Sequence, residues 1–257
     1  MLAFVHDGGF EGLLSAVFDA YSLKRFPDLL LSGKDTPPLT VTAAHTVATS
    51  REKAERVFAG LKKRLSREGS HDILLAFLSE EPGIATLLFR HIQAVFDRPA
   101  FPEGDFADAT TFKIDRIARQ VSRERHQLLG FARFQKTAEG LYFAVLRPKY
   151  NVLALMLPHF EARFAAQRWI LYDAGRGFGF LHDQSGIREL WLDRGTLHGA
   201  QLPESLLAPD EPFFQELWRG YFDATAIKER ANPELQARCL PRRYWAYITE
   251  LRPCLRP

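Results

Sequence analysis

The sequence is poor in cysteine: Cys239 and Cys254 are the two residues of this type in a chain of 257. Two cysteines cannot build a disulfide framework, and their spacing does not match that of zinc ligands. Unpaired thiols of this kind are typical of a reducing cytosol. The sequence therefore predicts two free thiols and no metal site.

Long apolar runs are also missing. No stretch approaches the roughly 18 consecutive apolar residues that a membrane-spanning helix requires. Asp7 and Glu11 interrupt the beginning of the chain, so it lacks the basic start and apolar segment of a signal peptide. We therefore expect a cytoplasmic protein without a membrane partner.

The familiar catalytic signatures are absent. Gly8 and Gly9 follow an expected strand, but neither a phosphate-loop Lys-Ser/Thr pair nor a G-x-G-x-x-G pattern accompanies them, which favours a simple tight turn. The metalloprotease, deaminase and nucleophile-elbow motifs are missing too. No cofactor is predicted, and no reaction can be read from the sequence.

Single residues suited to acid–base chemistry are nevertheless present. The candidates are Glu11, His126, His159 and Asp173. Arg176 could stabilise developing negative charge beside them. An enzyme acting on nucleic acid or nucleotides would need His159, Asp173 and Arg176 in one concave pocket, and a lone histidine of this kind is more often structural.

An apolar share of 46% and a charged share of 25% predict a globular protein with a packed core. We expect a single domain over residues 1–257 that can be divided into a mainly helical part, 1–104, and an α+β part, 105–257. The spacing of apolar residues in the first part predicts short strands and several helices. These are strands at 2–6 and 39–47 and helices at 10–23, 49–65, 70–78 and 83–96.

The second part predicts a long basic helix followed by two hairpins with a helix between them. The segments are helices at 111–129, 151–164 and 212–225, hairpins at 130–146 and 169–182, and a strand at 187–192. The aromatic helix 212–225 is best explained by core packing. The fold class is α+β: a helix-rich N-terminal part with short strands, then an antiparallel sheet built from a β-hairpin–helix–β-hairpin unit packed against helices.

Charge is distributed unevenly along the chain. Residues 111–180 contain twelve lysines and arginines against five acids, whereas residues 181–227 contain eight acids against three arginines. A side of the protein that faces a polyanion would produce this asymmetry. Chance variation on a solvated surface is the alternative, because the net charge is only +3.

Three basic segments are candidates for contact with phosphates. The expected helix 111–129 repeats arginine at steps of three or four residues with little interleaved acid. Glycines flank Arg176, and arginines near the C-terminus adjoin aromatic rings, a mixture that binders of single-stranded nucleic acid use. A solvated helix, an ordinary surface turn and buried rings are the alternative interpretations. The predicted nucleic-acid contacts are Arg116, Arg119, Arg123, Arg133, Arg176, Arg242, Arg243, Tyr244 and Trp245.

Several segments resemble a bacterial family of domains of unknown function that is described as DNA metabolism or DNA repair proteins. The matching segments are 7–18, 124–135, 158–164, 169–177 and 232–245. They follow in order over nearly the whole chain. Gly9 is a departure, because a serine is expected at that position in the family.

The resemblance implies a pathway and no catalytic residue. It implies work beside a radical-SAM protein and a uracil-DNA glycosylase-like protein, with this chain resembling the form that is not fused to the glycosylase. Three functions follow as hypotheses: a DNA-binding accessory factor, an enzyme using His159, Asp173 and Arg176, or an adaptor that binds its protein partner through the acidic region 181–227 without touching DNA. Binding DNA and docking a protein partner through the acidic region are compatible with each other.

Overall fold

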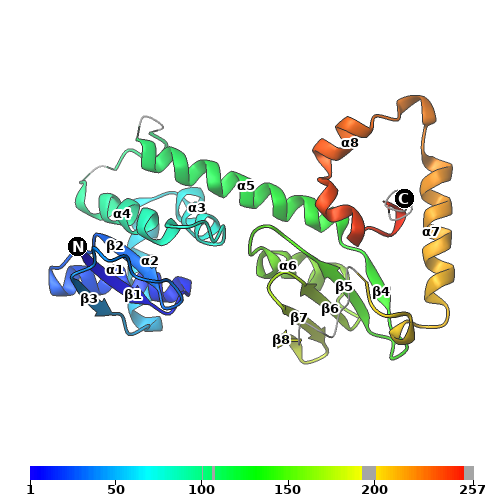
Figure 1. Cartoon of the computed structure of the whole chain (residues 1–257), viewed down its shortest axis with the longest axis horizontal. Coiled ribbons are helices and arrows are strands. Elements are labelled where there is room, and N and C mark those ends of the chain that lie inside the picture. The colour runs from blue at the N-terminus through cyan, green and yellow to red at the C-terminus, as the bar shows by residue number, and fades with distance from the viewer. Residues whose placement is uncertain (100, 106–107, 193–200, 252–257) are drawn as a thin grey trace. The chain divides into compact units, whose positions relative to one another are not determined.

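The computed structural model describes residues 1–99, 101–105, 108–192 and 201–251. The chain forms two compact units, Met1–Ser122 (unit 1) and Arg123–Pro257 (unit 2). The long helix α5, Ala109–Phe131, contains the boundary between them (Figure 1). The sequence suggested a division near Gly104 instead, where proline and glycine interrupt the chain.

Unit 1 is built around a small parallel sheet. The central strand β1 (Leu2–His6) pairs in parallel with β2 (Leu29–Ser32) on one side and β3 (Ala43–Thr46) on the other. Gly8, with a φ of +90°, turns the chain from β1 into α1 (Phe10–Leu23). The predicted strand–turn–helix opening is thus confirmed, while β2 had not been predicted.

Helices complete unit 1, and their starts follow from the sequence. They are α2 (Arg51–Arg64), α3 (Arg67–Phe77), α4 (Ile84–Asp97) and the first part of α5. Thr49 and Ser50 are both suited by sequence to cap α2, and the side chain of Ser50 accepts the hydrogen bond from the Lys53 amide. Ser66 caps α3 in the same way through Gly69. Their apolar sides form a core that includes Leu61, Ile73, Leu88 and Ile92.

Unit 2 contains a mixed sheet, in which five strands follow each other in chain order within the described residues. They are β4 (Phe134–Lys136), β5 (Tyr142–Leu146), β6 (Trp169–Asp173), β7 (Phe178–Asp183) and β8 (Gly186–Trp191). The α+β class and the hairpin–helix–hairpin order are confirmed. The expectation of a wholly antiparallel sheet needs a correction, because β5 and β6 run parallel. The crossover helix α6 (Leu153–Arg163) carries the chain back to the end of the sheet at which β5 begins. Strand β6 therefore runs in the same direction as β5.

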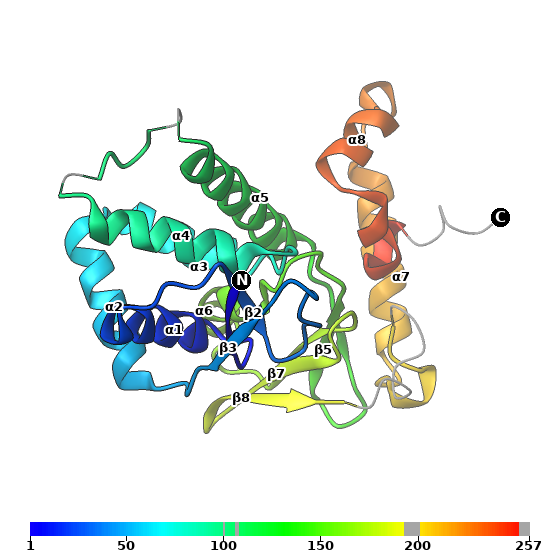
Figure 2. The ribbon, with the colours of Figure 1, turned by 60° about the vertical axis from the view of Figure 1, so that its left-hand side comes forward.

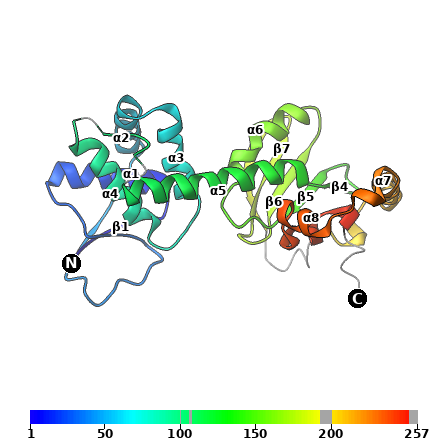
Figure 3. The ribbon, with the colours of Figure 1, turned by 90° about the horizontal axis from the view of Figure 1, so that it is seen from above.

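Different elements cover the two faces of this sheet. On one face, Phe160 of α6 packs edge-on against the Trp169 ring. On the other face, Phe143 and Tyr172 belong to a cluster that includes Leu202 and contacts Tyr247. Figure 3 shows α6 on one side of the sheet and the red C-terminal segment on the other.

The remaining elements of unit 2 lie C-terminal to the sheet. They are the short helices η1 (Glu204–Leu206), η2 (Lys228–Arg230) and η3 (Arg242–Tyr247) and the longer helices α7 (Glu211–Thr225) and α8 (Pro233–Cys239). Figures 1 and 2 show α7 at the periphery of the unit. Among the described residues, no helix is both long and apolar enough to cross a bilayer. Cys239 is an exposed free thiol, and Cys254 lies outside the described residues.

Helix α7 is where the sequence predicted it, but its aromatic side chains are not core. Phe213 is 59% exposed, Leu217 53% and Tyr221 61%. These side chains lie at steps of four residues and therefore share one side of the helix. Core packing is thus the wrong explanation. The exposed side chains Phe213, Phe214, Leu217, Trp218 and Tyr221 are called the apolar face of α7 below.

Candidate functional site

The basic side chains of unit 2 gather where two parallel strands end. Strands β5 and β6 are parallel neighbours, so their carboxyl ends lie at the same edge of the sheet. Arg147 and Lys149 follow β5, and Arg176 lies in the turn after β6. Ligands of α/β sheets commonly bind beyond the carboxyl ends of parallel strands. This edge is therefore the candidate site.

Glu124 of α5 is a buried carboxylate that contacts several elements at this edge of the sheet. It is 3% exposed and accepts hydrogen bonds from the backbone amides of Lys149 (2.9 Å) and Tyr150 (2.8 Å). The hydroxyl of Tyr244 also donates to it, and Nη2 of Arg243 lies 3.3 Å away. One buried carboxylate thus connects α5, the loop after β5 and the C-terminal helix η3.

Tyr244 is correspondingly fixed. It is 2% exposed, and burial together with the neighbouring Glu124 raises the pKa of its hydroxyl. A ring in this position packs in the core and offers no face to a nucleic-acid base. The expectation that Tyr244 stacks on a base therefore does not fit its burial.

Asp173 holds the second loop. It is fully buried and accepts hydrogen bonds from the backbone amides of Gly175 (2.8 Å) and Arg176 (3.1 Å). Nη1 of Arg176 lies 2.9 Å from the Asp173 carboxylate. Burial raises the pKa of Asp173 although the Arg176 guanidinium opposes that effect.

The same arginine joins the two loops. Nη1 of Arg176 donates to the carbonyl of Pro148 (3.3 Å), and Nη2 donates to the carbonyl of Lys149 (3.0 Å). Its side chain is only 19% exposed. Arg176 therefore orders the loop that carries Arg147 and Lys149. It does not project freely from a glycine turn, as the sequence had suggested.

Arg147 lies over the turn that Asp173 organises. A Cβ placed on Gly175 would be 3.5 Å from Cγ of Arg147 and 3.1 Å from Oδ1 of Asp173. The Arg147 side chain thus lies beside this turn, while the close Asp173 oxygen favours glycine at position 175. We call Arg147, Lys149, Arg176 and Arg243 the basic cluster. The two carboxylates that organise it, Glu124 and Asp173, are both buried, so positive charge predominates on its exposed side.

The other predicted arginines of unit 2 differ in availability. Arg133 is ion-paired to Glu250 at 2.6 Å, and its guanidinium lies 5.5 Å from the centre of the Trp218 ring. Burial raises the pKa of Glu250, but the hydrogen bonds from Arg133 and others outweigh it and hold the pKa below its usual range. Arg133 thus has a structural partner. Exposed Arg242 lies 5.7 Å from the centre of the Trp245 ring, whose Nε1 donates to the Leu240 carbonyl.

The three arginines predicted on α5 are exposed. Arg116 and Arg119 belong to unit 1 and Arg123 to unit 2. Arg119 forms an ion pair with Asp115 at 2.9 Å, one helical turn before it. Such an exposed pair is weak and does not prevent the arginine from contacting a phosphate.

Within unit 2, the candidate catalytic residue His159 is not grouped with Asp173 and Arg176. Glu11 is exposed at the start of α1 in unit 1, and His126 is exposed on α5 in unit 2. His159 is exposed on α6 and lines a cavity of about 350 Å³ together with Arg133 and other residues. The residues lining this cavity do not include Asp173 or Arg176. The structure therefore brings Asp173 and Arg176 together, but not His159 with them.

Sequence reasoning missed Arg147, Lys149 and Glu124 as site residues. A signal for the first two existed, since they directly follow the apolar strand 142–146 and a long segment leads to the next strand. A helical crossover of that length commonly joins parallel strands, whose carboxyl ends bind ligands. Glu124 had no such signal, because its partners are up to 120 residues away in the sequence.

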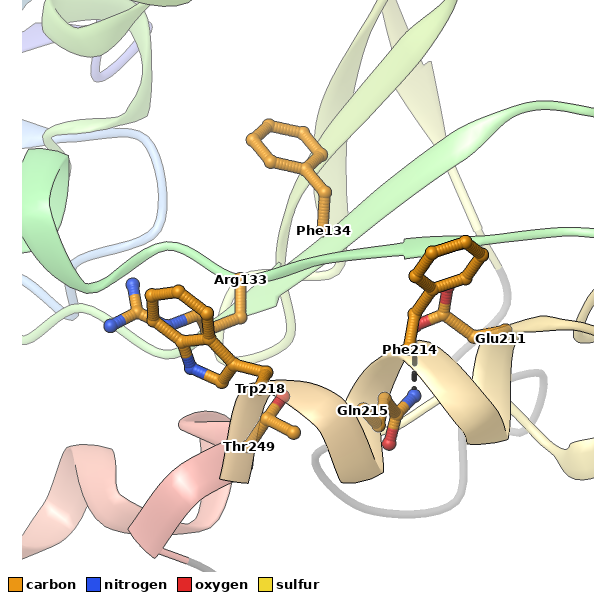
Figure 4. A pocket seen from close by; sticks show the side chains of 7 residues that line it. All are labelled: Arg133, Phe134, Glu211, Phe214, Gln215, Trp218 and Thr249. Carbon is orange, nitrogen blue, oxygen red and sulfur yellow. Dashed lines mark hydrogen bonds between the residues drawn. The ribbon is translucent and has the colours of Figure 1, made fainter. Parts of the chain in front are cut away.

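A second feature of unit 2 is the pocket beside the apolar face of α7. Figure 4 shows the Arg133 and Trp218 side chains next to each other, and Gln215 hydrogen-bonded to Glu211. The pocket has a volume of about 290 Å³. It is lined by Arg133, Phe134, Glu211, Phe214, Gln215, Trp218 and Thr249. The pocket therefore lies between exposed rings of α7 and strand β4.

Comparison with known proteins identifies a family and no activity. A family model described as a domain of unknown function, DUF4130, matches residues 82–250. The matched range contains the mixed sheet, the basic cluster and α7. No curated protein matches the chain. With about two thirds of its length matched by this model, the chain belongs to the DUF4130 family of domains of unknown function.

Proposed function

We propose that this protein is a nucleic-acid-binding accessory factor of DNA metabolism or repair, and that its basic cluster contacts the phosphate backbone. The observation that carries the proposal is the gathering of Arg147, Lys149, Arg176 and Arg243 at the edge where β5 and β6 end. The carboxylates among them are buried, so a polyanion would meet cations at this surface.

The four cations have different roles in the proposal. Arg147 and Lys149 are exposed, and the Arg243 side chain is half-exposed, so these three contact phosphate oxygens. Arg176 is a positioning residue, because its guanidinium is hydrogen-bonded to Asp173 and to two carbonyls of the loop. Exposed Arg242 adds a fifth cation beside Trp245, and this ring is the remaining candidate for stacking on a base.

A binding measurement on the full chain tests this function. The affinity for fluorescently labelled single-stranded DNA, double-stranded DNA and single-stranded RNA is measured by anisotropy at fixed salt. Replacing Arg147 and Lys149 by alanine removes two charged contacts and lowers the affinity at least about tenfold. Arg168→Ala is the matched control, because this exposed arginine directly precedes Trp169 at the opposite end of β6. Equal affinity of all three proteins would refute the proposed interface.

The apolar face of α7 favours a second, compatible function as an adaptor. Contiguous exposed apolar side chains of this extent commonly mark a protein-binding surface. Helix α7 also carries exposed Glu216 and Asp223, within the acidic region that was expected to dock a protein. The partners we propose are the radical-SAM protein and the uracil-DNA glycosylase-like protein that the family resemblance implies.

Co-purification tests the adaptor function. The chain is mixed with each of these two purified partners, and retention is compared between the wild type and Leu217→Asp. The substitution adds a charge to the apolar face of α7 and abolishes retention, whereas Glu161→Ala on the exposed side of α6 leaves it unchanged. Retention of the Leu217→Asp protein at the wild-type level would exclude α7 as the docking surface.

A further inference from the structure

Unit 1 contains an acidic cavity that the function proposed above does not use. It has a volume of about 120 Å³ and lies among α3, α4, α5 and the segment that joins the last two helices. Four carboxylates line it: Glu68 and Asp72 from α3, Glu103 from the connecting segment and Asp115 from α5. All of these residues belong to unit 1, so the cavity is independent of the basic cluster.

Two of the four carboxylates have structural roles. Glu103 accepts hydrogen bonds from the amide (2.7 Å) and the hydroxyl (2.5 Å) of Ser66 at the start of α3. A Cβ on Gly69 would be 2.0 Å from Oε1 of Glu103, so glycine is required for the carboxylate to occupy this place. Asp115 is ion-paired to Arg119.

The other two carboxylates, Glu68 and Asp72, form no hydrogen bond or ion pair with any residue that the structure describes. Burial raises the pKa of Asp72, and the nearby Asp115 adds to this. Like charges held together in this way repel each other and destabilise the folded state. In the described part of the chain, Arg119 is the only cation that is ion-paired to any of the four carboxylates, and its side chain is exposed.

The wall of the cavity also contains a buried histidine with an unused nitrogen. His91 is 6% exposed, and its Nδ1 has no hydrogen-bond partner among the described residues. Burial lowers the pKa of His91 to about 4, so the ring is neutral at pH 7. A neutral imidazole has one nitrogen that can accept a hydrogen bond. Buried polar atoms are rarely left unpaired, and this one points to a missing partner.

An aromatic ring completes the wall. Phe101 lines the cavity and packs edge-on against His91, with ring centres 5.3 Å apart. The guanidinium of Arg98 lies 6.0 Å from the centre of the Phe101 ring, so the ring already has a cation beside it and contributes an apolar wall. The cavity therefore offers carboxylates, a neutral imidazole and an aromatic ring within a small volume. Among the described residues, no group of three His, Cys, Asp or Glu side chains is arranged to hold a metal ion.

We propose that this cavity binds an organic cation, an alkylammonium or guanidinium group. Its N–H groups donate hydrogen bonds to Asp72, Glu68 and Nδ1 of His91, and its charge offsets the repulsion among the four carboxylates. The volume suits a head group and a short alkyl stem. Both a free amine and the Lys or Arg side chain of a partner present this chemistry.

Titration of the full chain by NMR tests the proposal. The probes are methylguanidinium, butylammonium and blocked tripeptides with a central Arg or Lys, each compared with potassium chloride at equal ionic strength. We expect saturable shifts confined to signals of the cavity residues, including the His91 ring. If a tripeptide binds more than about tenfold more tightly than the free cation, the source is a partner side chain. If both bind equally, it is a small molecule.

Two variants and a control decide the outcome. Asp72→Asn removes one charged contact and weakens binding about tenfold, while its thermal midpoint stays equal to or above that of the wild type because repulsion is relieved. Glu68→Gln, at an exposed position, weakens binding about threefold without touching the core. Glu52→Gln on α2 is the exposed control and changes nothing.

Three results would overturn the proposal. The first is the absence of saturable shifts in the wild-type protein. The second is equal affinity of the wild type and Asp72→Asn. The third is tighter binding of Mg²⁺ or Mn²⁺ than of any organic cation at the same residues, since this would make the cavity a metal site.

Discussion

The buried carboxylates of unit 2 and those around the acidic cavity of unit 1 serve opposite purposes. In unit 2, three buried carboxylates each hold an arginine: Glu124 with Arg243, Asp173 with Arg176, and Glu250 with Arg133. In unit 1, four carboxylates surround one cavity, and the one arginine ion-paired to them among the described residues is mostly exposed. Paired carboxylates stabilise loops and fix side chains in place, whereas crowded ones store unfavourable energy that a bound cation can relieve.

The comparison also distinguishes arginines whose side chains stabilise the fold from cations that a ligand can reach. Arg133 and Arg176 are bound to carboxylates and carbonyls. Arg147 and Lys149 are exposed at the edge that the Arg176 contacts organise, and Nζ of Lys149 donates a hydrogen bond to the neighbouring Tyr150 hydroxyl (2.8 Å). A basic sequence segment therefore does not by itself reveal which charges a ligand can reach.

The largest effect is expected at Glu124. Its replacement by alanine leaves two backbone amides and the Tyr244 hydroxyl without their acceptor, and Arg243 without its counter-charge. We expect the free energy of unfolding to fall by about 3–5 kcal/mol, as when one partner of a buried network is removed. Urea denaturation measures the change, with exposed Glu161→Ala as the control. A loss below about 1 kcal/mol would contradict the role given to Glu124.

A pair of variants sharpens the distinction between structural and available cations. Arg133→Ala leaves the nearly buried Glu250 carboxylate without its arginine and lowers the free energy of unfolding by about 2–3 kcal/mol. Because this arginine is engaged by Glu250, DNA affinity stays within about twofold of the wild type. Arg147→Ala is expected to lower the DNA affinity and to leave the free energy of unfolding nearly unchanged. If the two variants behaved alike in both assays, the distinction would have to be given up.

The pH dependence of stability probes unit 1. The pKa of His91 is 6.5 when unfolded and about 4 when folded, so the unfolded chain binds a proton that the folded one does not. The His91 contribution is therefore complete above pH 6.5 and is lost as the pH falls from 6.5 towards 4, by roughly 1.4 kcal/mol per pH unit. Denaturant titrations between pH 7 and 5 measure the slope, and His91→Gln flattens it. An identical slope in this variant would show that His91 does not titrate as described.

The smallest effect is expected on the apolar face of α7. Leu217→Ser changes a side chain that is 53% exposed, so the free energy of unfolding changes by no more than about 0.5 kcal/mol. Buried Leu171→Ser in β6 is the contrasting control and costs several times more. A large loss at Leu217 would mean that α7 packs against the protein after all.

Local features of the fold could be read from the sequence because they depend on neighbouring residues. The cap at Ser50, the strand before Gly8 and the two hairpins of unit 2 are examples. The parallel pairing of β5 and β6 could not be read in this way, since alternation of apolar residues shows which face is buried but not which strand lies alongside.

The candidate site was less predictable for the same reason. The Asp173–Arg176 pair spans three residues and was open to local reasoning, whereas Arg243 meets Glu124 across 119 residues. The sequence correctly indicated an aromatic helix at 212–225, but it could not show that these rings are exposed. Contacts between distant segments decide both matters.

The dependence of DNA affinity on salt tests the central claim most directly. Each phosphate contact by a cation releases counterions, so the logarithm of the binding constant falls linearly with the logarithm of the salt concentration. We expect a steep slope for the wild-type protein, a slope smaller by about 2 for the Arg147→Ala/Lys149→Ala protein, and an unchanged slope for Arg168→Ala. A slope that is the same in all three proteins would contradict the claim that the basic cluster contacts the phosphate backbone.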